Sequence, residues 1–215
     1  MPPETAPDWS PDEIATRFDV SRETLERLQL YVDLLYHWNR RINLVSPKSL
    51  TQVWKRHIGD SIQLLALEDL PDGRWVDLGA GAGLPGMIVA VAGDRPVTLV
   101  ESDRRKAAFL REAARRTGAD VEILTARIED LEPLKAAVIS ARALAPLDRL
   151  LGLAAPHLSA HGVALFLKGQ DIDFELTEAT KSWIMHVKTI PSLVDDRGCL
   201  AVISGLAGRH RGDSG

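Results

Sequence analysis

The chain has 215 residues, which suits one sizeable domain or one domain with a small appendage. A formal net charge of -4 argues against a general nucleic-acid coat protein but is compatible with a local basic face. The sequence has no apolar run long enough to span a bilayer and no apolar signal segment near its start. We therefore expect a cytoplasmic protein with no membrane partner.

The first part of the chain predicts three helices. A capping-box pattern at Ser10 predicts a short helix that ends near Phe18. Ser21 can cap a second, longer helix with an apolar stripe, and a third helix is predicted from about Leu50 to Leu67. We expect residues 1–70 to form a helical extension packed on the rest of the protein.

Short apolar runs then alternate with helical segments. The predicted strands are Trp75–Leu78, Val97–Glu101, Val121–Leu124, Ala137–Ser140 and Val163–Leu167. The predicted helices are Pro85–Ala92, Asp103–Thr117, Pro146–His157 and Phe174–Trp183. Two closing strands, Met185–Ile190 and Leu200–Ile203, have no helix between them and predict an antiparallel hairpin at one edge of the sheet. The pattern predicts an α/β fold, a doubly wound and mostly parallel seven-stranded sheet over residues 71–207, with a frayed tail at 208–215.

The stretch VDLGAGAGLPGM, residues 76–87, follows the first predicted strand and can bind a nucleotide-like ligand. Two ligands compete for it. Residues 81–86 satisfy the dinucleotide pattern G-x-G-x-x-G, which is weak evidence alone. Read from Asp77, the pattern is acid-x-Gly-x-Gly-x-Gly, which resembles S-adenosylmethionine-dependent methyltransferases. A pyrophosphate would be repelled by Asp77, whereas the sulfonium and ammonium groups of S-adenosylmethionine would be attracted, so we favour the methyl donor.

Two further positions at the same edge of the predicted sheet can contact such a ligand. Glu101 ends the second strand and can accept hydrogen bonds from both ribose hydroxyls of either ligand, although it can also be an ordinary solvated acid. The turn after the third strand offers Ile128 and Glu129 for the adenine, and by sequence alone Glu129 and Asp130 could exchange roles.

Several stretches together resemble one family, the bacterial small-subunit ribosomal RNA guanine-N7 methyltransferases, also called glucose-inhibited division protein B. These stretches are WNRRINL at 38–44, RHIGDS at 56–61, the glycine loop at 77–86, KAAFLR at 106–111, Arg142-Ala143 and LKG at 167–169. The glycine loop is common to many methyltransferases, whereas the first two stretches are much more specific. Ala141 departs from the serine that is common in the family, but it is also small.

The resemblance implies the reaction and most of the site. The family methylates N7 of guanine-527 in 16S ribosomal RNA with S-adenosylmethionine, leaving S-adenosylhomocysteine. Its sites carry over to Gly79, Leu84, Ile128, Glu129 and Arg142. The full set of expected donor-binding residues, from the loop pattern and the resemblance together, is Asp77, Gly79, Gly81, Gly83, Leu84, Glu101, Ile128, Glu129 and Arg142.

Methyl transfer to guanine N7 needs no general base, because this nitrogen has a free lone pair and no proton at neutral pH. The enzyme must align N7 with the methyl group and exclude water. Arg142 and Lys168 end the fourth and fifth predicted strands, beside the donor, and are the candidate catalytic residues because a cation can bond guanine O6 or a phosphate. Each could instead form a salt bridge at the end of the sheet.

The third predicted helix carries candidate RNA contacts. Arg56 and Asp60 are four residues apart, so they share a helix face, and His57 belongs to the same stretch. These residues either form a surface ion pair and a satisfied histidine, or a polar lid that meets RNA. Arg40 could extend a positive face toward phosphates. No cysteine or histidine cluster has metal-ligand spacing, so we expect no metal.

The expected partner is 16S ribosomal RNA or the small ribosomal subunit, with no DNA partner, and we expect a monomer. Two other functions remain open from the residues. One is a methyltransferase that acts on a small molecule or a protein, against which the stretches at 38–44 and 56–61 count. The other is a non-catalytic nucleotide-binding or division-regulating protein.

Overall fold

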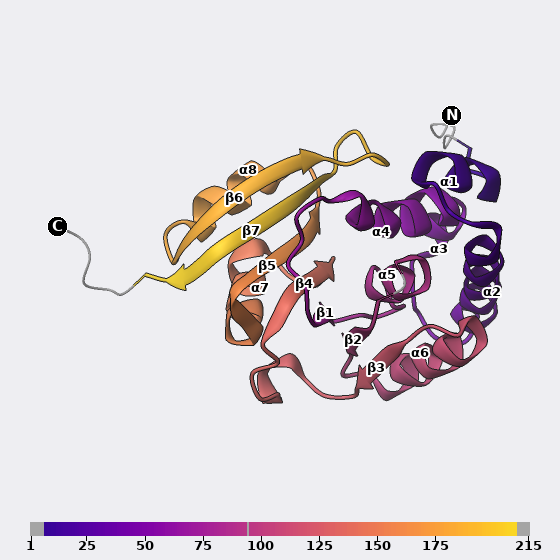
Figure 1. Cartoon of the computed structure of the whole chain (residues 1–215), viewed down its shortest axis with the longest axis horizontal. Coiled ribbons are helices and arrows are strands. Elements are labelled where there is room, and N and C mark those ends of the chain that lie inside the picture. Colours follow the sequence, from indigo (N-terminus) through magenta and orange to yellow (C-terminus); the bar gives the residue numbers. More distant parts are fainter. Residues whose placement is uncertain (1–6, 94, 210–215) are drawn as a thin grey trace.

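The computed structural model describes residues 7–93 and 95–209. At its centre is a seven-stranded sheet with the order β3-β2-β1-β4-β5-β7-β6 (Figure 1). The strands are β1 (Trp75–Leu78), β2 (Val97–Val100), β3 (Val121–Leu124), β4 (Ala136–Arg142), β5 (Leu158–Lys168), β6 (Trp183–Pro191) and β7 (Cys199–Gly208). The first five pair in parallel, and β7 pairs antiparallel with both β5 and β6. The predicted fold class and the antiparallel edge hairpin are confirmed.

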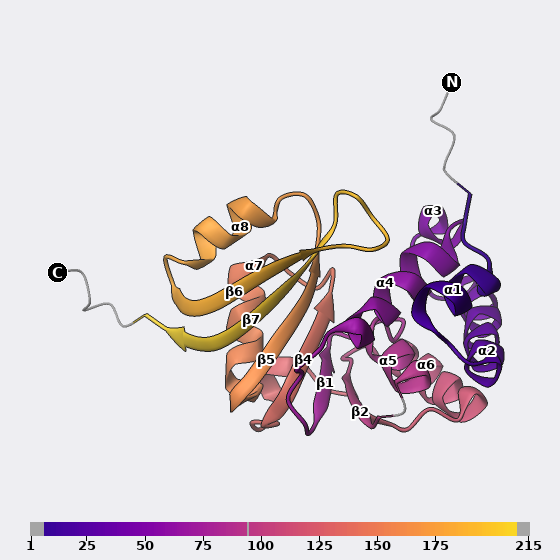
Figure 2. The ribbon, with the colours of Figure 1, turned by 45° about the horizontal axis from the view of Figure 1, so that its top comes forward.

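Helical segments cover both faces of this sheet (Figure 2). The long or regular helices are α1 (Pro11–Phe18), α2 (Arg22–Asn39), α5 (Gly86–Ala92), α6 (Arg104–Thr117), α7 (Leu147–Ala154) and α8 (Ile172–Ala179). The short segments are α3 (Pro47–Leu50), η1 (Trp54–Gly59), α4 (Asp60–Ile62), η2 (Gln63–Ala66), η3 (Ile128–Asp130) and η4 (Ala155–His157). One apolar cluster joins the helices up to α6 to one face, and another joins α7 and α8 to the opposite face. No helix within the described ranges is both long and apolar enough to cross a membrane.

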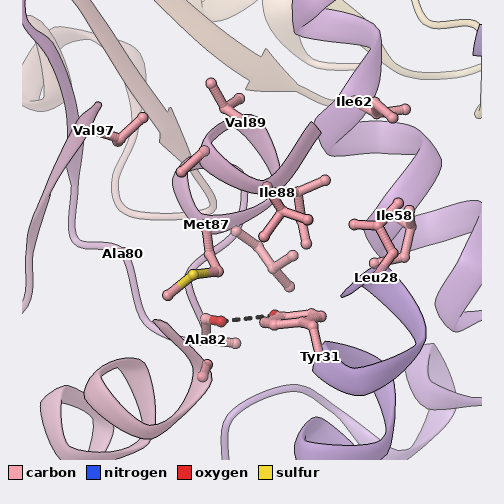
Figure 3. Packing of buried hydrophobic residues seen from close by; sticks show 14 of the residues in the cluster. Leu28, Tyr31, Ile58, Ile62, Ala80, Ala82, Met87, Ile88, Val89 and Val97 are labelled. Atoms are coloured by element: carbon pink, nitrogen blue, oxygen red, sulfur yellow. Dashed lines mark hydrogen bonds between the residues drawn. The ribbon is translucent and has the colours of Figure 1, made fainter. Parts of the chain in front are cut away.

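The helices before β1 are attached directly to the glycine loop. Tyr31 of α2 is fully buried, and its hydroxyl donates a hydrogen bond to the carbonyl oxygen of Ala82 at 2.7 Å (Figure 3). Burial raises the pKa of the Tyr31 hydroxyl well above its usual value, so this group remains a donor at all ordinary pH values. The capping box predicted at Ser10 is confirmed, with reciprocal bonds between Ser10 and Glu13.

The single helix predicted over Leu50–Leu67 is wrong, because this region consists of separate short segments. In a continuous α-helix the Trp54 amide would donate to the Leu50 carbonyl oxygen. Here that amide donates to Asp8 Oδ2 at 3.0 Å, and the Leu50 oxygen accepts from the Tyr36 hydroxyl at 2.8 Å. Side chains from distant segments thus satisfy both ends of one helical hydrogen bond. The segment η1 then forms a π-helix, in which the Asp60 amide donates to Lys55 O.

Two predicted boundaries near the end of the chain are also wrong. The helix predicted over Phe174–Trp183 ends at Ala179, and Trp183 begins β6, where it pairs with Gly208 of β7. The predicted tail at 208–215 begins too early, because β7 includes Gly208 and the Arg209 amide donates to Ser182 O at 2.9 Å. The antiparallel ladder supplies partners for these backbone groups; residues 210–215 lie outside the described ranges.

Asp77 of β1 links three elements beneath the glycine loop. It is fully buried; Oδ2 accepts from the Gly86 amide at 3.0 Å and Oδ1 accepts from the Ser140 hydroxyl at 2.6 Å. The Ser140 oxygen in turn accepts from Trp75 Nε1 at 2.9 Å. Gly86 has no room for a side chain, since a Cβ there would lie 2.5 Å from the Cβ of Asp77. This network fixes the start of α5 against β1 and β4.

Removing the Asp77 carboxyl should destabilise the fold. In Asp77→Ala the buried Gly86 amide and Ser140 hydroxyl lose their acceptor, so we expect the free energy of unfolding to fall by about 2–3 kcal/mol. Urea denaturation followed by circular dichroism measures this change. Asp77→Asn is the matched control, because its amide oxygen can still accept from Gly86, and it should lose less.

A comparison of wild type with Asp77→Asn also tests the ionisation of Asp77. Burial raises the pKa of this carboxyl from 3.8 to about 7, so the folded chain binds the proton more tightly than the unfolded chain. Its stabilising contribution is therefore complete below about pH 4 and is lost as the pH rises to about 7. The excess stability of wild type over Asp77→Asn should be larger at about pH 5 than at about pH 8. An excess that grows as the pH rises would contradict this assignment.

Candidate active site

The first cavity lies at the carboxyl ends of the parallel strands, with a volume of about 290 Å³. Parallel α/β sheets bind ligands at this edge. Five of the expected donor-binding residues line the cavity together, from the loops after β1, β2 and β3: Gly79, Gly81, Glu101, Ile128 and Glu129. The structure therefore brings together residues that are up to 50 positions apart in the chain.

Glu101 organises the mouth of this cavity. Its Oε2 accepts from the Gly81 amide at 2.8 Å, and its Oε1 accepts from the Asp103 amide at 2.7 Å. The carboxylate is 7% exposed and faces the cavity, with further lone pairs available on both oxygens. Glu101 therefore holds the glycine loop and can also accept ligand hydroxyls.

Gly79 is required for the shape of the loop. Its φ of +64° favours glycine, and a Cβ at this position would lie 2.5 Å from Cδ1 of Leu144, another residue of the cavity wall. A side chain here would thus both strain the backbone and push Leu144 toward the cavity.

Three other expected donor residues are buried within the glycine loop or at its start. Asp77 is buried with both oxygens bonded to the protein, and Gly83 and Leu84 are also buried. None of the three is among the described residues that line the cavity. Their geometry indicates a role in supporting the loop, and ligand contact by them remains a hypothesis.

The turn η3, where we expect contact with adenine, has a support that the sequence did not reveal. His157 is 2% exposed, and its Nε2 donates to the carbonyl oxygen of Ile128 at 3.2 Å. Glu129 lines the first cavity, with its side chain 45% exposed and Oε1 lying 3.6 Å from Arg127 Nη2. Asp130 is exposed and is not among the described lining residues, so geometry favours Glu129 over Asp130 as the adenine partner.

A second cavity of about 520 Å³ lies beside the first. Arg56, His57, Asp60, Arg142 and Lys168 all line it, which brings together most of the predicted substrate and catalytic residues. Arg40 is exposed at the end of α2 and is not among the described residues that line this cavity.

Arg142 ties the end of β4 to η1. Its Nη1 donates to the carbonyl oxygen of Arg56 at 2.9 Å, and its Nη2 donates to His57 Nδ1 at 3.0 Å. Nη1 also lies 3.5 Å from Asp60 Oδ2, and the Arg142 side chain is 17% exposed. A planar guanidinium can bridge these acceptors at once.

Burial and the positive charges of Arg142 and Arg56 keep His57 neutral. Burial, followed by the nearby charges of Arg142 and Arg56, lowers the pKa of His57 to about 3. Since Nδ1 accepts from Arg142, the proton lies on Nε2, which is buried without a hydrogen-bond partner among the described residues. Burial raises the pKa of Asp60, and the guanidinium of Arg142 opposes this rise. His57 is therefore not a base that takes up a proton near neutral pH.

Lys168 is paired within the protein. Its Nζ lies 2.6 Å from Glu175 Oε2 and donates to the carbonyl oxygen of Ala145 at 3.3 Å. The same Glu175 oxygen accepts from the Leu147 amide at the start of α7 at 2.6 Å. Glu175 was not predicted as a site residue, and nothing in its sequence position links it to Lys168. This pairing reduces the free charge that Lys168 offers to a substrate.

Ala143 connects the two cavities, because it lines both. It follows Arg142 directly and has a φ of +51°, an uncommon conformation for a residue with a side chain. The resemblance had singled out the Arg142-Ala143 pair, but only the structure reveals that Ala143 lines both spaces. A group bound in one cavity can reach a group bound in the other at this point.

Across residues 7–93 and 95–209, the structure contains no group of three or more His, Cys, Asp or Glu side chains that could hold a metal ion.

Solved structures share the fold. A methyltransferase from Aquifex aeolicus, described as S-adenosylmethionine-dependent, superposes with a TM-score of 0.56 at 14% identity, covering 76% of this chain and 98% of that one. A predicted O-methyltransferase from Agrobacterium tumefaciens gives a TM-score of 0.53 at 21% identity, covering 71% of this chain and 82% of that one. These likenesses establish the class I methyltransferase fold.

Sequence relatives define the family. The protein from Paramagnetospirillum magneticum named ribosomal RNA small subunit methyltransferase G is 54% identical over 87% of this chain and 92% of its own length. The protein of the same name from Rhodospirillum centenum is 49% identical over 95% of this chain and 94% of its own length. The family model described as rRNA small subunit methyltransferase G matches residues 24–199. The resemblance inferred from the motifs is thus confirmed, and the chain belongs to the rRNA small subunit methyltransferase G family.

Proposed function

We propose that this chain transfers a methyl group from S-adenosylmethionine to N7 of guanine-527 in 16S ribosomal RNA. The observation that carries the proposal is the pair of cavities that meet at Ala143, one at the glycine loop and one lined by Arg142 and His57. The direct test is to map N7-methylguanine in 16S RNA from cells with and without this protein. The absence of any change at this guanine would overturn the assignment.

The residues of the first cavity fit the methyl donor. The Glu101 carboxylate can accept the two ribose hydroxyls, and the η3 turn offers apolar contact from Ile128 beside Glu129. The bound donor would supply an electrophilic methyl group. Glycines at 79 and 81 allow close approach of the ligand to the backbone.

The second cavity fits a guanine nucleotide of RNA. Arg56 is exposed at its rim and can meet a phosphate, while Arg142 is held in place between η1 and the end of β4. The Arg142 guanidinium can donate toward guanine O6 and leave N7 free to react. Neutral His57 agrees with a reaction in which no proton has to be removed from the nucleophile. Orientation and exclusion of water are then the main contributions of the protein.

The proposed function also implies a partner and a location for the protein. The partner is 16S ribosomal RNA or an assembling small subunit, and we propose that the enzyme acts as a monomer in the cytoplasm. Transfer of label from the methyl donor to small subunits, compared with transfer to free small molecules and proteins, separates this function from a methyltransferase with another substrate. A complete lack of transfer would favour a non-catalytic binding protein.

The glycine loop yields a prediction about donor binding. Gly79→Ala should weaken binding of S-adenosylmethionine at least about tenfold, because the added Cβ displaces Leu144 into the first cavity. Isothermal titration calorimetry measures the affinity. Gly118→Ala is the matched control for backbone strain, since Gly118 has a φ of +65° but no atom within 4 Å of an added Cβ. Equal losses in the two variants would exclude a specific role for Gly79.

Glu101 yields a second prediction. Glu101→Ala should weaken donor binding by about 1–3 kcal/mol, since a charged acceptor of hydrogen bonds is lost. Asp120→Ala, which removes an exposed acid just before β3, is the control and should bind as wild type does. A dissociation constant equal to that of wild type for Glu101→Ala would remove this residue from the ribose site.

Arg142 should affect catalysis more than donor binding. We expect Arg142→Ala to lower the single-turnover methylation rate on small subunits at least about tenfold, or about 1.4 kcal/mol in the barrier. Arg142→Lys should restore only part of the rate, because an ammonium cannot bridge Arg56 O and His57 Nδ1 as the guanidinium does. Arg22→Ala is the control for loss of one positive charge, because Arg22 is exposed at the start of α2.

His57 reports independently on the Arg142 variant. Because Arg142 helps to lower the pKa of His57, the histidine pKa should rise in Arg142→Ala. A pH titration followed by NMR of the imidazole ring measures this shift. A normal single-turnover rate in Arg142→Ala, together with the expected shift of His57, would show that Arg142 has a structural role only, and the substrate assignment of the second cavity would fail.

A further inference from the structure

The segment that precedes α1 is fastened to the start of η1. Asp8 Oδ2 accepts from the Trp54 amide at 3.0 Å, and Asp8 Oδ1 accepts from the Lys55 amide at 2.8 Å. These are the first two residues of η1, where helical amides have no acceptor within their own helix. One carboxylate 46 positions upstream of Trp54 supplies both acceptors.

The neighbouring residue, Trp9, lies against the other end of η1. A Cβ added to Gly59 would lie 2.8 Å from Cζ3 of the Trp9 ring, so the ring lies directly on the backbone of Gly59. The Arg17 guanidinium lies 4.5 Å from the ring centroid, and the Lys55 ammonium lies 5.8 Å from it. These cation–π contacts fix the ring over η1. Asp8 and Trp9 therefore hold the beginning and the end of one six-residue segment.

The segment η1 supplies two residues to the lining of the second cavity. Arg56 and His57 belong to η1, and both accept from Arg142. A π-helical segment is rare, and the residue before η1, Val53, supplies no side-chain cap for it. In this chain the support comes from residues 8 and 9, which lie outside the 24–199 segment that the family model matches.

We propose that Asp8 and Trp9 are positioning residues for methyl transfer, which hold η1 in the shape that orients Arg56, His57 and Arg142. The inference rests on the proposed function of the second cavity. The contacts of Asp8 go to η1, whereas α1 has its own cap in Ser10 and Glu13. Loss of the Asp8 carboxylate should therefore loosen η1 and leave α1 intact.

The test compares Asp8→Ala with Asp12→Ala in the full-length chain. Asp12 is an exposed acid in the first turn of α1, so its replacement removes the same charge from the same segment. Asp8→Ala should lower the single-turnover rate at saturating small subunits at least about fivefold, while donor affinity measured by calorimetry stays within about twofold of wild type. Asp12→Ala should match wild type in both measurements.

Hydrogen exchange measured by mass spectrometry supplies a readout that does not depend on activity. In Asp8→Ala the backbone amides of residues 54–59 should exchange faster, whereas those of β1 and α5 should be unchanged. Asp8→Asn, whose amide oxygen can still accept, should recover part of the rate and part of the protection, and it carries the test if Asp8→Ala does not fold. Trp9→Phe should likewise recover part of what Trp9→Ala loses.

Arg142→Ala, assayed beside these variants, distinguishes failure of the positioning role from failure of the proposed function. If Arg142→Ala is slow but Asp8→Ala transfers methyl groups at the wild-type rate, the positioning role is wrong and the proposed function stands. If Arg142→Ala is as fast as wild type, the substrate assignment of the second cavity fails and the positioning role fails with it. A rate loss in Asp8→Ala without faster exchange at residues 54–59 would also overturn the proposal.

Discussion

Two hydrogen bonds to the buried carboxylate of Asp77 join β1, the start of α5 and β4. The glycine loop runs between the first two of these elements, so its path is fixed at both ends. Gly86 can come so close to Asp77 only because it has no side chain. The third element, β4, ends in Arg142 and is followed by Ala143, so the network that shapes the first cavity also sets the position of the second.

A single cation then organises the charges between the cavities. Burial lowers the pKa of His57, and the charge of Arg142 lowers it further; the same charge opposes the effect of burial on the pKa of both Asp60 and Asp77. The result is a neutral histidine beside a fixed guanidinium. This arrangement suits transfer to an uncharged nitrogen, where a strong base would have no proton to remove.

Much of the fold was predictable because its signals are local. Alternating apolar runs and helices located all seven strands, and the Ser10 capping box was found at the predicted position. The prediction of one continuous helix over residues 50–67 was wrong because the break in this helix depends on Asp8 and Tyr36, which are distant in the chain. The predicted end of α8 was wrong for a similar reason, since Trp183 belongs to β6 and pairs with Gly208 of β7.

The candidate site, like the fold, was predictable where the signals are local and not where they depend on tertiary contacts. Motifs named Gly79, Glu101, Arg142 and His57, and each of them lines one of the two cavities. The partners of these residues were missed, because Glu175 beside Lys168 and His157 beside Ile128 are brought there only by tertiary packing. The sequence pattern also could not reveal that Asp77 is enclosed, since a carboxylate at the end of a strand fits contact with a ligand equally well.

Each of the two cavities that meet at Ala143 has exposed lining residues that the other lacks, and this bears on how ligands enter. The exposed residues Ser102, Arg127 and Arg149 line the first cavity and not the second, whereas exposed Arg56 lines the second and not the first. Under the proposed function, the methyl donor and the RNA therefore need not enter through the same opening.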